Sequence, residues 1–460
     1  MSFSKYTNLF FNYIFYYNHY LKISRLLENK AFSTKEGIEE YQFIRLKNII
    51  TYAYLNVPYY NKLFNQIGFT PDDFKSISDI KKIPYLTKQI IRKNQDELIS
   101  ENIQKKYLKR VQTGGTTGMP TEFILDKRYS TLTEMVYLNH IWGRFGYRKR
   151  DKCIVLREDN IEGIIAGKKY WKRNLLTNWL VMSAFHLNAD TFQLYYDKIM
   201  SYKPKFILAF ASNAYLLARF IKDNNLKPIP SIKAVICGSE KLYEWQRRYM
   251  TDVFKARVFS YYGHSEKCIL ATESSDSESF EFYPQYGFVE LINKEGDYCS
   301  TENERGEIVA TGFNNFVSPF IRYKTDDVGT YTTKAGSDNP HWFNIKRISG
   351  RTQDFLFDFD NIPKTYMHID RPFWDILDKL YAYQYVQNEP GKILLNIHAK
   401  TKLNESEIKI VRDVFHKTYF KFELEIQYVD NIQKSRSGKF RYLIQNIKIP
   451  ENNSFQIQEL

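Results

Sequence analysis

The sequence predicts an α/β protein with a large N-terminal domain of mixed and parallel sheets and a small α+β C-terminal domain. Between residues 153 and 237, short apolar runs alternate with helical stretches, which favours βαβ units and a mostly parallel sheet. From residue 283 to residue 331 the strand-like runs lie closer together and are separated by turn sequences, which predicts an antiparallel section. The pattern changes again after Gly350, so we expect domains at 1–349 and 350–460.

The N-terminal region is expected to be helical. Residues 1–30 are rich in aromatic side chains but lack the run of about 20 apolar residues that crosses a membrane, so we expect an amphipathic helix. Packing on the protein body and peripheral contact with a membrane both stay open for this helix. Residues 34–67 have a helical apolar spacing that is interrupted before Pro58, because a residue that precedes proline avoids the helical region. Thr70 and Pro71 are typical of a helix start.

The middle of the chain contains the predicted parallel strands. The short β-rich runs at 153–156, 206–210 and 234–237 are typical of the strands of a mostly parallel sheet. Residues 214–221 have a helical pattern and lie between the second and third of these runs. A chain of 460 residues can bury such a core without disulfide bonds.

Composition restricts the class of protein. The chain has 66 lysines and arginines and 52 aspartates and glutamates, so its formal net charge is +14. The basic residues lie in short scattered groups, which indicates a general basic surface or attraction to an anionic ligand, and we expect no nucleic-acid partner. The four cysteines have no close spacing, so we expect neither a disulfide framework nor zinc. We see no secretory signal pattern and expect a cytoplasmic protein, with the inner face of the membrane as the alternative location.

The sharpest motif is Gln-Thr-Gly-Gly-Thr-Thr-Gly-Met-Pro at residues 112–120. Its glycines free the backbone to turn N–H groups toward a phosphate, and its threonine hydroxyls are further donors. The segment lacks the Gly-Lys-Ser/Thr sequence of a Walker A loop. Taken alone, it is equally compatible with a polar hairpin turn.

Four further segments give this loop a context. They are Tyr-Gly-His-Ser-Glu at 262–266, Ile-Arg-Tyr-Lys-Thr-Asp-Asp-Val-Gly at 321–329, Ile-Ser-Gly-Arg-Thr-Gln-Asp at 348–354 and Lys-Ser-Arg-Ser-Gly-Lys-Phe-Arg at 434–441. Their order resembles the signature of the adenylate-forming superfamily, which activates a carboxylate with ATP as an acyl-adenylate and releases pyrophosphate. The stretches 53–60 and 80–92 resemble, more closely, the phenylacetate–CoA ligase branch with its capsular-polysaccharide-biosynthesis members.

The resemblance implies a nucleotide site. The implied phosphate loop comprises Thr113, Gly114, Gly115, Thr116, Thr117 and Gly118. The implied adenine site comprises Gly238, Ser239, Glu240, Tyr262 and Gly263, with Tyr262 stacked on the base. Asp327 would accept the ribose hydroxyls, which suits a carboxylate, and Arg351 would lie near ribose and phosphate.

The resemblance also implies catalytic residues. Ser265 would contact the α-phosphate, Glu266 would hold Mg²⁺, and Lys439 would bridge the carboxylate and the α-phosphate. A positive charge there offsets the negative charge that develops as the carboxylate attacks phosphorus. The small C-terminal domain would move to bring Lys439 into the site. The alternative for each residue is an ordinary structural or surface role.

Three positions depart from the family pattern. Asp326 stands before Asp327 where the family usually has glycine, and this extra acid either repels phosphates or points outward. Gln353 occupies the hinge position, which is usually charged. Asp360 stands near a position where coenzyme A ligases usually have glycine, so the acceptor is coenzyme A or an amine.

Contacts to the acid are expected from a separate group of residues. A lone histidine more often fills a structural hydrogen-bonding role, and this alternative stays open. The candidate substrate contacts are His140, His186, Phe210 and Ser212.

We therefore expect an ATP- and Mg²⁺-dependent ligase that activates a small carboxylic acid and transfers the acyl group to an amine or to coenzyme A. The resemblance to the capsule branch places this reaction in surface-polysaccharide biosynthesis. Two alternatives remain: a relative that has lost catalysis and acts as an interaction module, and a basic protein that binds nucleic acid or a membrane.

Overall fold

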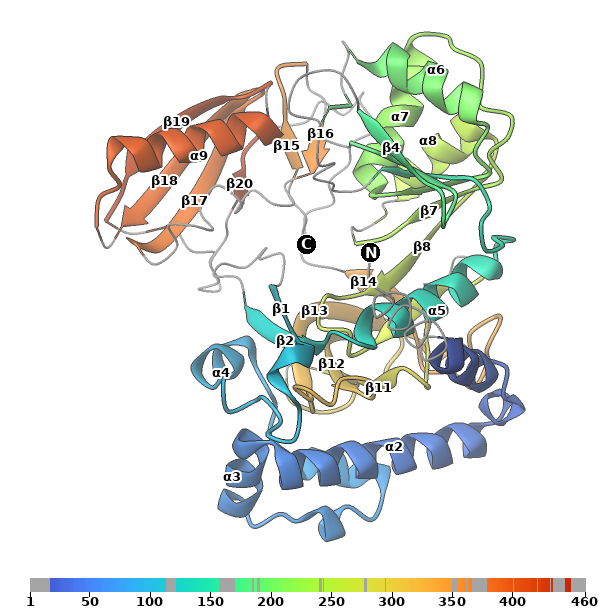
Figure 1. Ribbon diagram of the computed structural model, residues 1–460, viewed down its shortest axis with the longest axis vertical. Coiled ribbons are helices and arrows are strands. Elements are labelled where there is room, and N and C mark those ends of the chain that lie inside the picture. Colours follow the sequence, from blue (N-terminus) through green and yellow to red (C-terminus); the bar gives the residue numbers. More distant parts are fainter. Residues whose placement is uncertain are drawn as a thin grey trace, which may run out of the picture. The chain divides into compact units, whose positions relative to one another are not determined.

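The computed structural model (Figure 1) contains two compact units. One unit comprises residues 1–113, 121–149 and 260–351, and the other comprises residues 114–120, 150–259 and 352–460. The structure describes residues 17–112, 121–156, 170–183, 186–187, 191–239, 242, 244–276, 279–293, 295–349, 355–360, 363–365, 379–399, 401–419, 421–430, 432 and 443–447.

Helices form the N-terminal part of the first unit, as expected. Residues 17–27 are helical, and residues 1–16 of the expected N-terminal helix lie outside the described residues. Thr34 caps the long helix α2, which begins at Lys35, by accepting a hydrogen bond from the Gly37 amide at 3.2 Å. The elements that follow are η1 (Lys30–Ser33), α2 (Lys35–Asn56), α3 (Pro58–Gln66), η2 (Pro71–Asp73), η3 (Ile77–Lys82), α4 (Lys88–Lys93) and η4 (Lys105–Tyr107).

Proline and a capping box set the boundaries of these helices. Val57 has φ −120°, so α2 ends there and α3 begins at Pro58. The expected helix start at Thr70 is confirmed as the one-turn helix η2, where Thr70 and Asp73 form a capping box. Leu46 and Ile50 of α2 are fully buried, and the helix contacts β11 (Figure 1).

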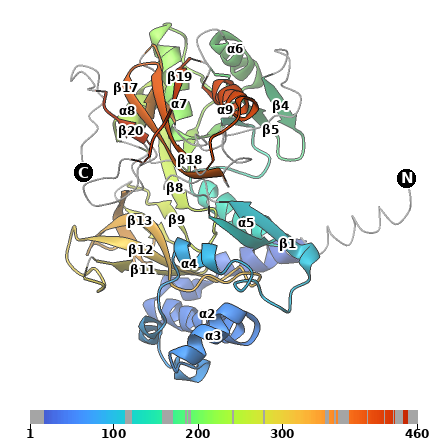
Figure 2. The same cartoon turned by 90° about the vertical axis from the view of Figure 1, so that its left-hand side faces the viewer.

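The predicted antiparallel section, residues 283–331, contains β11, β12 and β13, and the antiparallel pairing of the first unit extends beyond it on both sides (Figure 2). The strand order in this unit is β11-β12-β13-β14-β10-β9-β8. The bounds are β8 (Arg257–Gly263), β9 (Leu270–Glu273), β10 (Phe280–Phe282), β11 (Gly287–Ile292), β12 (Arg305–Gly312), β13 (Tyr323–Tyr331) and β14 (Asn344–Ser349). This unit also contains the hairpin β1 (Leu108–Gln112) and β2 (Glu122–Asp126) and the helix α5 (Ser130–Gly143).

The second unit contains the predicted parallel strands. The strand order is β7-β6-β3-β5-β4, and β4 is an antiparallel edge strand. The strands are β3 (Cys153–Leu156), β4 (Trp171–Asn174), β5 (Trp179–Met182), β6 (Phe206–Ala209) and β7 (Ala234–Cys237), with helices α6 (Phe192–Tyr202), α7 (Ala211–Asp223) and α8 (Glu244–Phe254). All residues of β3, β6 and β7 are buried, as expected for strands covered on both faces.

The C-terminal part has a smaller sheet of its own. Its strand order is β19-β18-β17-β20, and α9 is closed by a capping box between Asn404 and Glu407. The elements are β15 (Phe355–Phe357), β16 (Pro363–Thr365), β17 (Leu380–Glu389), β18 (Lys392–Ala399), α9 (Glu405–Thr418), β19 (Glu423–Tyr428) and β20 (Leu443–Gln445). The mixed α/β class with a smaller C-terminal sheet is thus confirmed. The boundary between 349 and 350 stays a prediction.

None of the described helices combines the length and the apolar character that a membrane crossing requires.

Candidate functional site

Asp327 lies in a bulge of β13. Val309 of β12 pairs with Lys324, whereas Glu307 pairs with Val328, so Thr325, Asp326 and Asp327 stand opposite the single residue Ile308. The Thr325 hydroxyl donates to the Ile308 carbonyl at 2.7 Å and accepts from the Asp327 amide at 3.1 Å. Bulges of this kind re-aim side chains beside active sites, and this bulge fixes the backbone of the expected ribose-binding residue.

Tyr262 and Asp327 are brought into direct contact. The Tyr262 hydroxyl at the end of β8 donates to Asp327 Oδ2 at 2.8 Å, across 65 residues of sequence. Both side chains are only partly buried. Burial raises the pKa of the Asp327 carboxyl above its ordinary value, and the hydrogen bond from Tyr262 opposes that shift. The pair places an aromatic ring beside a carboxylate acceptor, as expected for a site that binds a nucleoside.

Glu266 is a buried, ionised carboxylate. Its Oε1 accepts a hydrogen bond from the Tyr323 hydroxyl at 2.5 Å, and its Oε2 lies 3.3 Å from His264 Nδ1. Burial alone raises the pKa of Glu266, but His264 and Tyr323 outweigh it and lower the pKa to about 2. The site therefore holds a fixed negative charge at neutral pH.

A pair of glycines supports the segment that carries Glu266. Gly287 of β11 pairs with Gly312 of β12 in register. A Cβ atom at Gly287 would lie 2.0 Å from the Cys268 carbonyl oxygen, and one at Gly312 would lie 3.1 Å from Cys268 Cα. The absence of side chains at both positions lets the backbone after Glu266 lie directly on the sheet.

Asp326, the extra acid, is held by a lysine. Its side chain is 45% exposed, and its Oδ2 accepts a hydrogen bond from Lys88 Nζ at 2.8 Å. Lys88 is the first residue of α4, and its side chain is 8% exposed. Of the two alternatives for Asp326, an outward-pointing and paired carboxylate agrees with this geometry.

The remaining expected nucleotide and catalytic residues divide into two groups. Ser265 is exposed and lies in the same turn as Glu266, two residues after Gly263 at the end of β8. Gly238 and Ser239 follow β7 in the second unit, and Ser239 has φ +66°. The residues that lie outside the described part of the chain are Thr113, Gly114, Gly115, Thr116, Thr117, Gly118, Glu240, Arg351 and Lys439. The expected phosphate loop lies between two described strands, because β1 and β2 pair antiparallel up to Gln112 and Glu122.

The candidate substrate histidines each have a hydrogen-bond partner. His140 Nδ1 lies 2.9 Å from the Tyr283 hydroxyl, and His186 Nδ1 lies 2.8 Å from the Ser183 hydroxyl. Burial lowers the pKa of both imidazoles. This arrangement fits the structural role that was the alternative to substrate contact.

The other two candidate substrate contacts lie at the start of α7. Phe210 is 4% exposed and is the residue before this helix. Ser212 belongs to the first turn of α7.

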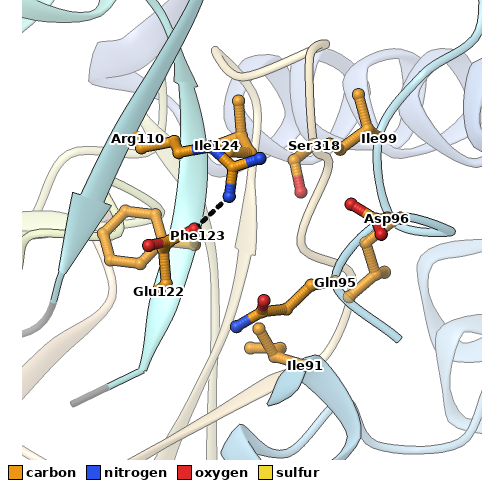
Figure 3. Close-up of a pocket in the computed structure, with 10 residues that line it drawn as sticks. Ile91, Gln95, Asp96, Ile99, Arg110, Glu122, Phe123, Ile124 and Ser318 are labelled. Carbon is orange, nitrogen blue, oxygen red and sulfur yellow. Dashed lines mark hydrogen bonds and ion pairs between the residues drawn. The ribbon is translucent and has the colours of Figure 1, made fainter. Parts of the chain in front are cut away.

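A small recess lies elsewhere in the first unit (Figure 3). It is lined by residues of α4, β1, β2 and the segment after α4, together with Ser318 from the connection between β12 and β13, and Arg110 pairs with Glu122 at its edge. Neither Tyr262, Glu266 nor Asp327 lines it, so it is no part of the candidate nucleotide site.

Glu266 fits the requirements of a magnesium ligand. Mg²⁺ binds hard oxygen ligands and is usually held by one or two carboxylates together with substrate phosphates and water. Glu266 provides an ionised carboxylate. Among the described residues, no group of three or more histidine, cysteine, aspartate or glutamate side chains could hold a metal by itself.

Two residues that contact the candidate site were not assigned a role by the sequence motifs. Lys88 lies in the stretch 80–92, and Tyr323 lies in the segment 321–329, but neither motif assigned them a contact. Their partners are 238 and 57 residues away, and only the fold brings them together.

Comparisons with known proteins place the fold and the class of the protein. The solved structure of 2-hydroxyisobutyryl-CoA ligase in complex with 2-HIB-AMP and CoA has the same fold, with a TM-score of 0.60 and 16% identity over 89% of each chain. The expected relationship is confirmed: homologues of the chain come from the phenylacetate–CoA ligase and CapK groups, and they support an AMP-forming ligase as the class of the protein.

Two relatives and one family model make this relationship specific. Protein CapK of Staphylococcus aureus is 25% identical over 94% of this chain and 93% of its own length. Phenylacetate-coenzyme A ligase of Pseudomonas putida is 25% identical over 72% of this chain and 74% of its own length. The model of the CapK C-terminal domain matches residues 363–446.

Proposed function

We propose that the protein activates a carboxylic acid with ATP as an acyl-adenylate, releases pyrophosphate and then transfers the acyl group to coenzyme A or an amine. The observation that carries this proposal is the contact between Tyr262 and Asp327, with the buried carboxylate of Glu266 four residues after Tyr262. These residue types match what a bound nucleotide needs: a ring for the base, an acceptor for ribose hydroxyls and an anionic ligand for a metal. The relationship to phenylacetate–CoA ligases supports the same reaction.

Each residue has a defined part in the proposed reaction. Tyr262 stacks on adenine, and Asp327 accepts the ribose hydroxyls. Ser265 binds the α-phosphate, and Glu266 would hold Mg²⁺, which neutralises phosphate charge when bound. Gly238 and Ser239 border the base.

The roles of the residues outside the described part are proposed from the motifs alone. The loop 113–118 wraps the β- and γ-phosphates, and Arg351 lies near ribose. Lys439, in a C-terminal lid that begins near residue 350, stabilises the charge that develops as the acid attacks phosphorus.

The acceptor and the biological setting come from the relatives. The name of the Pseudomonas putida relative identifies coenzyme A as an acyl acceptor, whereas the CapK relationship supports a role in surface-polysaccharide assembly. Asp360, near the position where coenzyme A ligases usually have glycine, accepts a hydrogen bond from Lys421 at 2.5 Å. Because a charged side chain occupies this position in place of glycine, we propose an amine as the alternative acceptor to coenzyme A.

The test is release of pyrophosphate from ATP by the full-length protein with a panel of carboxylic acids. We expect acid-dependent release that Lys439→Ala reduces by about a hundredfold or more, as for loss of a preorganised charge. Lys409→Ala, a change of an exposed lysine on α9, is the matched control and is expected to leave release unchanged. Absence of release with every acid, together with tight salt-dependent binding to DNA, would favour the basic-protein alternative.

The second step is tested separately with the acid that supports release. Coenzyme A and ammonia are added in parallel, and the nucleophile that is consumed with ATP and acid is the acceptor.

A further inference from the structure

A short N-terminal segment is attached directly to the edge of the Asp327 bulge. Leu86 forms a parallel bridge with Tyr323, in which the Leu86 amide donates to the Arg322 carbonyl at 3.0 Å. The Lys324 amide in turn donates to the Leu86 carbonyl at 2.9 Å. Thr87 then caps α4 by accepting from the Ile90 amide at 3.2 Å. The first residue of α4, Lys88, is therefore fixed in position beside residues 325–327.

Lys88 holds two successive residues of the bulge. Its Nζ donates to Asp326 Oδ2 at 2.8 Å and to the Thr325 carbonyl at 3.3 Å. Its side chain is 8% exposed, and a buried ammonium is unfavourable unless it is paired and hydrogen-bonded. The two contacts provide this compensation, so the lysine is bound to the bulge rather than to bulk water.

Asp326 has an unusual backbone for a residue with a side chain. Its φ is +63°, in the left-handed region that favours glycine, although aspartate tolerates it better than most residues. The family usually has glycine at this position, which takes that conformation without strain. The ion pair with Lys88 offsets the strain in this chain, and the next residue is Asp327.

We infer that Lys88 and Asp326 form a positioning pair that holds the Thr325–Asp327 bulge so that Asp327 meets the ribose hydroxyls of the nucleotide. This inference rests on the proposed function. Lys88 acts through the bulge, and Asp326 takes the place of the family's glycine by adding a charge contact to an otherwise strained backbone.

A contact of Lys88 with phosphate is the competing explanation, and the sugar distinguishes the two. If Lys88 acts through Asp327, its loss weakens binding only when the ligand has ribose hydroxyls. If Lys88 contacts phosphate, its loss weakens ATP and 2′,3′-dideoxy-ATP equally.

The experiment measures binding of ATP and 2′,3′-dideoxy-ATP to the full-length protein by calorimetry. The wild type is expected to bind ATP about tenfold or more tightly than the dideoxy analogue, as for hydrogen bonds to a charged group. Lys88→Met is expected to lose most of this preference by weakening ATP alone. Lys82→Met, a change of the exposed partner of Asp79 in η3, is the matched control and keeps the preference.

Two further variants keep the inference testable if Lys88→Met fails to fold. Asp326→Asn changes an exposed side chain and is expected to reduce the preference for ATP by severalfold. The double variant Lys88→Met/Asp326→Gly removes both charges and restores the residue that adopts φ +63° freely, so it is expected to recover most of the preference.

The outcomes separate the inference from the proposed function. An unchanged preference in Lys88→Met or Asp326→Asn, or an equal loss for both nucleotides, overturns the positioning role alone. A wild type that binds neither nucleotide overturns the proposed function together with this inference.

Discussion

The Tyr323 hydroxyl donates a 2.5 Å hydrogen bond to Glu266 Oε1, which joins the start of β13 to the turn after β8. Tyr323 is fully buried, and its ring has no route to a ligand of its own. Its part in the site is to hold one oxygen of Glu266 and, together with His264, to lower the pKa of that carboxyl.

Loss of the Tyr323 hydroxyl is predicted to weaken the metal step. Tyr323→Phe keeps the ring and removes the donor to Oε1, so the pKa of Glu266 rises and the carboxylate is held by His264 alone. We expect the Mg²⁺ concentration for half-maximal pyrophosphate release to rise about tenfold, as for one hydrogen bond to a charged group. Tyr298→Phe removes a comparable tyrosine contact, to Glu290, and is expected to leave the Mg²⁺ dependence unchanged. An unaltered Mg²⁺ titration in Tyr323→Phe would contradict this role.

Ionisation of Glu266 is predicted to stabilise the fold, whereas ionisation of Asp327 is predicted to destabilise it. The folded-state pKa of Glu266 is about 2, below its ordinary 4.5, so its ionised form adds stability above pH 4.5 that is lost as the pH falls toward 2. Burial raises the pKa of Asp327, so its ionisation reduces stability as the pH rises through that pKa.

Thermal unfolding over a series of pH values checks both signs. Glu266→Gln is expected to unfold at a lower temperature at pH 7 and to lose the acid-side change of stability. Asp327→Asn is expected to unfold at an equal or higher temperature at pH 7 while losing ATP binding. A stabilising Glu266→Gln would show that the two hydrogen-bond partners do not compensate its burial.

Arg322 is predicted to be essential for folding stability. Its guanidinium forms a buried ion pair with Glu290 at 2.8 Å and donates to the Ile83 carbonyl at 2.8 Å. Arg322→Met leaves the Glu290 charge buried and unpaired, which costs about 3–5 kcal/mol. Lys62→Met breaks the exposed pair with Glu97 and is expected to change stability by about 1 kcal/mol or less. Urea unfolding of the two variants measures the difference, and equal effects would contradict the prediction.

Gly287, which lies against the backbone of Cys268, is predicted to tolerate no added methyl group. Gly287→Ala brings a Cβ to within 2.0 Å of the Cys268 carbonyl oxygen, so the backbone after Glu266 has to move. We expect a loss of about 1–3 kcal/mol and a fall in pyrophosphate release. Gly143→Ala at the end of α5 meets no atom within 4 Å and is expected to be neutral or stabilising by about 0.5 kcal/mol. A stable and active Gly287→Ala protein would show that the segment adapts.

Much of the architecture could be predicted from local pattern. The apolar run at 206–210 contains β6, the run at 234–237 is β7, and the interruption before Pro58 separates α2 from α3. These features depend on neighbouring residues, through burial on both strand faces and the restricted backbone before proline.

Less of the candidate site could be predicted from local sequence pattern. The motif 321–329 indicated Asp327, but the bulge that presents it depends on the register between β12 and β13. Lys88 meets Asp326 from 238 residues earlier, and no local spacing encodes that contact. Sequence reasoning also left open whether Asp326 repels phosphates or points outward, because the answer depends on this distant lysine.

Four successive positions at the start of the 322–327 segment contribute to different tasks. Arg322 secures the fold, Tyr323 orients Glu266, Lys324 receives the N-terminal segment, and Thr325 shapes the bulge before Asp327. A shift of one residue would move all of these contacts at once, because side chains of a strand alternate between its faces. A one-residue insertion or deletion before the bulge is therefore expected to weaken the fold and to displace Glu266 and Asp327 together.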